Sequence, residues 1–230
     1  MRVSRMARRL LRHHVPAAAA SLLGMLLVRA HFADKRVMFQ WSMATAYAGV
    51  TLLGISLAIG PLNLLAGRAN PVSSDIRRDV GIWAGLLSLA HAIVGLQVHM
   101  PHRYLYWLSA DPASGALSLR IDPFGLTNFA GLFAVFVAAL LLALSNDRSL
   151  RALCTPRWKQ LQRWNYVLYV LVVCHGAIYQ MTEKREGVFV FLFVSVCLPV
   201  IALQYMGYRR KTALSALRME NAPSSEGVEE

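Results

Sequence analysis

The chain has 230 residues, of which 56% are hydrophobic and only 16% charged, a composition outside the range of soluble globular domains. Its formal charge of +12 could suggest nucleic-acid binding, but the 24 Lys and Arg residues stand in short clusters between apolar stretches, as in membrane-protein loops. Cys154, Cys174 and Cys197 lack the close spacing of a disulfide framework or a zinc site. We therefore expect a membrane protein that contacts lipid and has no nucleic-acid partner.

Six apolar stretches approach the roughly 20 residues that a transmembrane helix needs. They are residues 15–32, 38–66, 80–100, 124–145, 164–182 and 187–208. The first is the weakest, because Arg29 and His31 shorten its apolar run, and with the basic start of the chain it could also be a signal peptide. The sequence predicts an all-α, six-helix transmembrane bundle over residues 1–211, followed by a short disordered cytoplasmic tail, 212–230.

The basic residues predict the orientation of the bundle, because Lys and Arg are retained on the cytoplasmic side of a membrane. With the N-terminus inside, 17 of the 24 Lys and Arg residues fall in cytoplasmic segments and 7 in outer segments. Both termini are therefore predicted to be cytoplasmic. The predicted location is a bacterial inner (plasma) membrane, which the chain crosses several times.

Two histidines, His91 and His175, lie deep inside apolar stretches. Each stands 11 residues from the cytoplasmic start of its span. At 1.5 Å per residue this places both roughly 16 Å into the membrane, near its middle. An ionisable side chain at that depth is costly unless it faces the bundle interior and has a partner. Equal depth on two helices favours a shared ligand, and the alternative is that each imidazole only hydrogen-bonds a neighbouring helix.

The ligand that best suits two intramembrane imidazoles is haem iron. Two neutral imidazoles from opposite sides fill both axial positions of a low-spin haem, whereas zinc would be left two ligands short. Ala84, Ser88 and Gly95 are small residues on the helical face of His91 and leave room for a bulky group, although they would also suit close helix packing. We predict that His91 and His175 bind the metal and that Ser88 and Gly95 lie beside the cofactor.

Three segments of the sequence carry a family resemblance. They are LLGISLAIGPLNLLAG (52–67), RRDVGIWAGLLSLAHAIVG (77–95) and LLALSNDRSLRALCTPRWKQLQRWNYVLYVLVVCHG (141–176). In order and spacing they resemble the ferric-reductase-like transmembrane family. The resemblance implies a six-helix cytochrome b in which His91 and His175 hold haem b. Family members commonly have another histidine 13 residues before the second ligand, where this chain has Gln162, so one haem is expected.

The function that the resemblance implies is electron transfer across the membrane. A cytoplasmic flavin reductase would supply electrons to the haem, and an extracytoplasmic redox enzyme, a quinone or a metal ion would accept them. No catalytic residue is predicted in the chain itself. At the inner face, Arg77, Arg78, Gln162 and Arg163 could bind a flavin (FMN or FAD) or dock an acidic donor, or they could be ordinary cytoplasmic loop residues.

Other readings of the sequence stay open. The outer loop, 101–123, could bind the acceptor or the haem propionates, or its aromatic residues could anchor the protein at the membrane interface. The chain could also be an enzyme that reduces a metal ion or oxidises quinol directly at the haem. A third class is a non-redox membrane scaffold, in which the two histidines only form hydrogen bonds.

Overall fold

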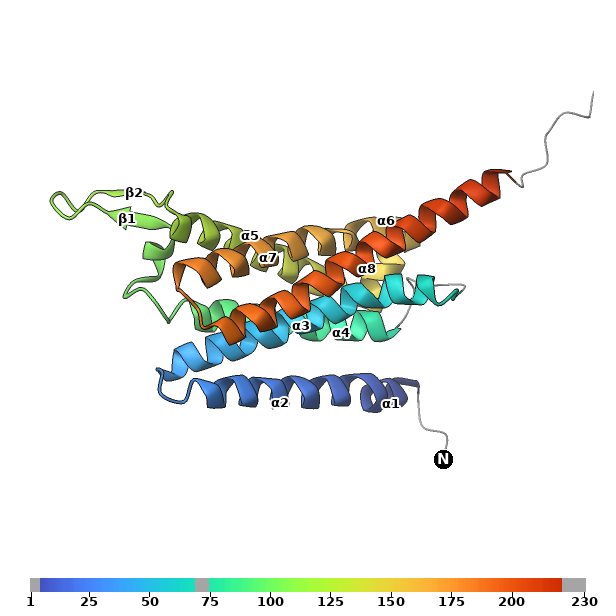
Figure 1. Cartoon of the computed structure of the whole chain (residues 1–230), viewed down its shortest axis with the longest axis horizontal. Coiled ribbons are helices and arrows are strands. Elements are labelled where there is room, and N and C mark those ends of the chain that lie inside the picture. The colour runs from blue at the N-terminus through green and yellow to red at the C-terminus, as the bar shows by residue number, and fades with distance from the viewer. Residues whose placement is uncertain (1–4, 69–74, 221–230) are drawn as a thin grey trace, which may run out of the picture.

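The computed structural model of the chain describes residues 5–68 and 75–220, which are mostly helical. The elements are α1 (Arg5–Arg9), the π-helix η1 (Leu10–His14), α2 (Val15–His31), α3 (Val37–Leu65), α4 (Asp75–Gly95), the 3-10 helix η2 (Arg103–Tyr106), β1 (Leu108–Ala110), β2 (Leu117–Leu119), α5 (Pro123–Leu144), α6 (Asp147–Gln162), α7 (Trp164–Thr182) and α8 (Gly187–Glu220). The long helices run along the molecule, with the β1–β2 hairpin at one end and the start of α1 and the end of α8 at the other (Figure 1).

Four helical segments are long and apolar enough to cross a membrane: Met6–His31, Val37–Leu65, Pro123–Leu144 and Gly187–Leu217. They agree with the predicted helical membrane protein. Helices α4 and α7 do not reach the same hydropathy, because α4 carries Arg78 and Asp79 near its start and each helix carries a histidine in its middle.

The expected spans 38–66, 124–145 and 164–182 agree with α3, α5 and α7 to within one residue at each end. Helix α4 begins and ends earlier than the expected span 80–100, since its charged first turn is helical and the chain turns outward after Gly95. Helix α8 continues to Glu220, so residues 212–220 are helical where a disordered tail was expected. Residues 221–230 lie outside the described part of the chain.

The outer loop contains an antiparallel β-hairpin that the sequence analysis did not predict. Leu108 pairs with Leu119, and the two strands are joined by a turn in which the Asp111 carboxylate accepts hydrogen bonds from the backbone N–H groups of Ala113 and Ser114. Gly115 has a φ of 70°, a left-handed conformation that favours glycine. At the opposite end of the bundle, the expected loop after α5 forms helix α6, which is interrupted at Cys154 (φ 58°).

Helix α3 is central to the bundle, where it packs against α2, α4 and α8. Its buried residues Leu53 and Leu57 join a core that includes Val137 and Ala138 of α5. The outward faces of the helices are also apolar: large side chains such as Phe136 and Phe191 are 65% and 69% exposed, as suits lipid contact.

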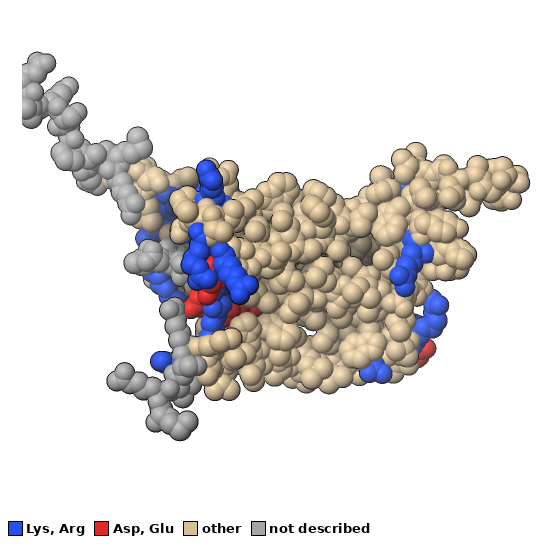
Figure 2. All heavy atoms as spheres, turned by 180° about the vertical axis from the view of Figure 1, so that it is seen from behind, with Lys and Arg blue, Asp and Glu red and all other residues tan. Residues whose placement is uncertain are grey.

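Charged side chains gather at the two ends of the molecule, and a broad uncharged band lies between them (Figure 2). The larger group of Lys and Arg covers the end that holds the start of α1 and the end of α8 (Figure 2). The basic clusters of the sequence therefore gather mainly at one end of the bundle, as a segregated membrane-protein pattern requires.

Candidate functional site

The two histidines that the sequence singles out lie close together inside the bundle. His91 comes from the middle of α4 and His175 from the middle of α7, and their ring centres lie 6.4 Å apart with the ring planes at 78°. A metal-bound imidazole nitrogen lies about 2 Å from the ion and about 1 Å from its own ring centre, so rings on opposite sides of one ion have centres roughly 6 Å apart. The observed spacing therefore fits one metal ion between the two rings.

Both imidazoles are oriented by a backbone carbonyl. The Nδ1 atom of His91 lies 3.0 Å from the carbonyl oxygen of Ser42 on α3, and that of His175 lies 2.8 Å from the carbonyl oxygen of Thr127 on α5. Because a carbonyl only accepts, each Nδ1 must carry the proton, which leaves the lone pair on Nε2. Among the described residues neither Nε2 has a hydrogen-bond partner. Metal-binding histidines commonly show this arrangement, in which a carbonyl fixes the tautomer.

A cavity of about 280 Å³ contains both rings in its lining. Its walls come from α3, α4, α5 and α7, with Phe193 of α8, and they consist mainly of apolar and small side chains. The volume lies just below the range for small-molecule and cofactor sites, about 300–1,000 Å³. The predicted neighbours Ser88 and Gly95 both line it.

A glycine on α5, Gly131, is the residue whose small size the site requires most. A Cβ atom built there would lie 2.8 Å from both Cε1 and Nδ1 of His175, closer than real contacts allow. At Gly95, a Cβ atom would lie 3.7 Å from the His91 ring, which is ordinary contact. Gly95 was predictable from its spacing to His91, whereas Gly131 was not, because nothing in the sequence indicates which ring approaches that position.

The donor set suits axial ligation of a haem and not a classical metal site. Within residues 5–68 and 75–220, no group of three or more His, Cys, Asp or Glu side chains is placed to hold a metal ion. A porphyrin supplies four nitrogen ligands of its own, so two opposed imidazoles complete six-coordinate iron. The residues present therefore fit the cofactor that the sequence resemblance implies.

The four inner-face candidates do not form one site. The Arg77 Nε donates to the carbonyl oxygen of Ser56, 3.2 Å away, while Arg78 pairs with Asp147 at 2.6 Å. The Arg78 guanidinium holds the pKa of Asp147 below its usual range. Gln162 and Arg163 lie at the junction of α6 and α7. There Gln162 accepts a hydrogen bond from Asn165, and its buried Nε2 has no partner among the described residues; Arg163 is exposed.

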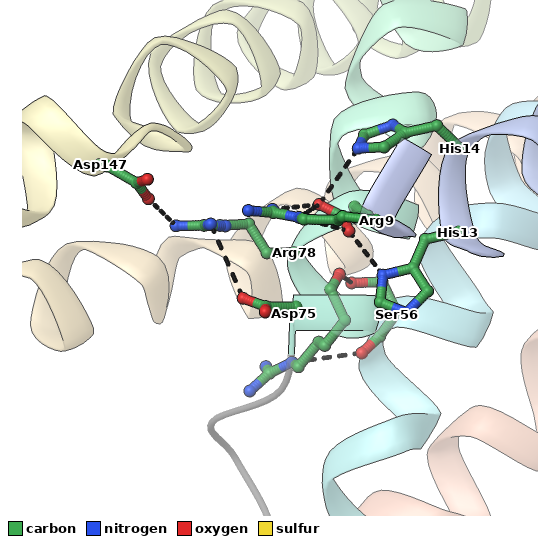
Figure 3. A network of polar contacts seen from close by, with 9 residues as sticks. Arg9, His13, His14, Ser56, Asp75, Arg78 and Asp147 are labelled. Atoms are coloured by element: carbon green, nitrogen blue, oxygen red, sulfur yellow. Dashed lines mark hydrogen bonds and ion pairs between the residues drawn. The ribbon is translucent and has the colours of Figure 1, made fainter. Parts of the chain in front are cut away.

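The same end of the bundle contains a buried carboxylate that the sequence analysis missed. Asp79 of α4 is 0% exposed, and Arg9 of α1 donates to both of its carboxylate oxygens. His13 Nδ1 and His14 Nε2 lie 2.8 Å and 3.4 Å from these oxygens (Figure 3). We call Arg9, His13, His14 and Asp79 the N-terminal clasp, since it fixes the start of the chain against α4.

The π-helix η1 explains how two successive histidines reach one carboxylate. In an α-helix, residues five apart in sequence point about 140° apart, so His14 would point away from the face that carries Arg9. In η1 the N–H of Val15 bonds to the carbonyl oxygen of Leu10, five residues earlier. This wider turn brings residues four and five positions apart toward one face, so both imidazoles can contact Asp79.

The fold and the site together define a helical protein with four helices apolar enough to span a membrane and with a pair of imidazoles that line one cavity. No protein-family model matches the chain. The site geometry therefore carries the functional argument.

Proposed function

We propose that this protein is a membrane cytochrome b of the ferric-reductase-like type, with one haem b held between His91 and His175. The observation that carries the proposal is the pair of rings 6.4 Å apart, each with Nδ1 hydrogen-bonded to a carbonyl and Nε2 without a partner. A haem bound there would be held by the two imidazoles and would supply one-electron chemistry at its iron. The chain itself fixes the ligands and surrounds them with apolar side chains.

The proposed role is that of an electron-transfer subunit between a cytoplasmic flavin reductase and an extracytoplasmic acceptor, such as a redox enzyme, a quinone or a metal ion. In overall size the chain resembles the haem-binding membrane subunit of the bacterial methionine-sulfoxide reductase system. The basic end of the molecule supports docking of an acidic donor, because charge complementarity accelerates encounter (Figure 2). Arg163 is available for such docking, whereas Arg77 and Arg78 are engaged within the bundle.

The proposed topology has six spans, in a bacterial inner membrane, with both termini cytoplasmic. Helices α4 and α7 count as spans in this topology although polar residues lower their hydropathy, because their polar side chains point into the bundle, as His91 and His175 do. Reporter fusions after each helix test this topology. An activity pattern that placed the β1–β2 hairpin and the α6 helix on the same side would contradict it.

Absorption spectroscopy of the purified protein tests the haem assignment. We expect a six-coordinate cytochrome b spectrum and about one haem per chain by pyridine haemochrome assay, both lost in His91→Ala and in His175→Ala. Wild-type spectra in both variants would show that other residues bind the iron. A value of two haems per chain would show that Gln162 does not prevent a second site.

A further inference from the structure

The cavity that contains the two imidazoles continues to the outer end of the bundle, where its lining becomes polar. His99, Trp107, Gln180 and Arg185 all line this outer mouth. Gln180 stands five residues after His175, which places it roughly 7–8 Å further out along the helix direction. A planar group held between the two imidazoles would therefore have one edge facing the mouth.

The mouth contains a cation that forms no ion pair within the described part of the chain, although Glu183 lies near enough to interact with its charge. The Arg185 guanidinium lies 4.9 Å above the Phe39 ring, and among the described residues it forms no hydrogen bond or ion pair. The nearby acid, Glu183, instead lies 3.7 Å from His99 Nδ1. A half-buried guanidinium with five donors is a strong binding group for a carboxylate, because charge-assisted hydrogen bonds gain strength away from water.

Two further buried polar atoms at the mouth have no hydrogen-bond partner in the described part of the chain. They are the indole Nε1 of Trp107 and the amide Oε1 of Gln180. The Nε2 of Gln180 donates to the Tyr47 hydroxyl at 2.7 Å, and that hydroxyl donates to the Phe189 carbonyl. Exchanging the amide oxygen and nitrogen of Gln180 would therefore lose a hydrogen bond. A ligand at the mouth must therefore accept from Trp107 and Arg185 and offer one proton to Gln180.

We infer that the outer mouth binds the propionate carboxylates of the cofactor, with Arg185 and Trp107 as donors to them. One carboxylate oxygen accepts from the guanidinium and another from the indole N–H. A water held by the carboxylate, or a carboxyl proton, donates to Gln180 Oε1. This inference rests on the proposed haem function, and it adds the orientation of the cofactor: its propionate edge faces the outer side of the membrane.

Haem and its dimethyl ester provide the test, because the ester keeps the iron and the ring but has no free carboxylates. Apoprotein purified from haem-deficient cells is titrated with each compound, and binding is followed by the six-coordinate spectrum. We expect the wild type to bind haem roughly tenfold or more tightly than the ester. Arg185→Gln should lose most of this preference by weakening haem binding while leaving ester binding nearly unchanged.

Two further variants make the result specific to the mouth. Lys184→Gln removes the same charge from the neighbouring residue, which is exposed and does not line the cavity, and should keep the wild-type preference. Trp107→Phe keeps an aromatic ring but removes the N–H donor, and should lose part of the preference. Equal affinity of the wild type for both compounds, or an unchanged preference in Arg185→Gln, would overturn the propionate assignment. Failure of both compounds to bind the wild type would instead overturn the haem function itself.

Discussion

In the N-terminal clasp, we expect removal of Arg9 to cost more stability than removal of the Asp79 charge, a difference that a surface ion pair would not show. Asp79 is fully buried, whereas the Arg9 side chain is 24% exposed at the edge of the bundle. Arg9→Ala therefore leaves a buried carboxylate short of its main partner, and Asp79→Asn leaves a guanidinium that water can still reach. Removing one member of a buried ion pair costs about 3–5 kcal/mol, and the two remaining histidines place Arg9→Ala near the lower end of this range.

Asp79→Asn should cost less, about 1–2 kcal/mol, because the asparagine can still form a hydrogen bond and no buried charge remains. The double variant should be less destabilised than the sum of the two single variants, since each substitution removes the reason for the other's cost. The free energy of unfolding is measured by denaturant titration in mixed micelles, followed by far-UV circular dichroism.

Arg8 offers a matched control for this experiment, because it is the neighbouring arginine, is exposed and forms none of the clasp contacts. Arg8→Ala should change the free energy of unfolding by less than about 0.5 kcal/mol. The reasoning would be refuted if Arg9→Ala cost no more than Arg8→Ala. It would also be refuted if the double variant lost the full sum of the two single effects.

Three further predictions follow from individual contacts. Gly131→Ala should displace the His175 imidazole, lower haem content several-fold and lower the free energy of unfolding by about 1–3 kcal/mol. Gly24→Ala, which adds a Cβ with no atom within 4 Å, should match the wild type in haem content and spectrum. Asp122 caps α5 by accepting from the Gly125 N–H at 2.6 Å, which lowers its pKa below the usual 3.8. Asp122→Ala should therefore cost about 1 kcal/mol at neutral pH, and the difference from the wild type should disappear as the pH falls through that lowered pKa; a difference constant with pH would exclude the carboxylate as the cause. Mass spectrometry of the protein isolated from membranes should find Arg9 in the mature chain, because cleavage after α2 would remove every clasp partner of the buried carboxylate.

The helix positions were predictable for the long apolar runs, even where a single histidine interrupts one, as in α7. Helices α3, α5 and α7 match their expected spans because the lipid-spanning length and the polar residues at each end limit where such a helix can begin and end. The β1–β2 hairpin was not predicted, since its strands are three residues each and their pairing depends on the turn at Asp111. The helical extension of α8 to Glu220 was missed because the basic residues from Arg209 to Lys211 suggested the end of the last span, although the Ala- and Leu-rich residues after them favour a helix.

The candidate site was predictable only in its ligands. His91 and His175 are visible in the sequence because an ionisable residue in an apolar span is rare, and equal depth follows from simple counting. The carbonyls of Ser42 and Thr127 that orient them come from other helices and have no sequence signal. Asp79 was overlooked for a similar reason: its position beside two arginines suggested a cytoplasmic loop, whereas its partners lie about 70 residues earlier in the chain.

The wide turn of η1 makes the start of the protein sensitive to insertions more than to deletions. A π turn contains about one residue more than an α turn, so deleting one residue between Arg9 and His13 would let the backbone tighten into an ordinary α-helix while Arg9 keeps its direction relative to α2. His13 and His14 would then stand three and four residues after Arg9, on the same helical face. Inserting one residue there would instead rotate Arg9 by about 100° away from Asp79, so an insertion in this segment should be more damaging than a deletion.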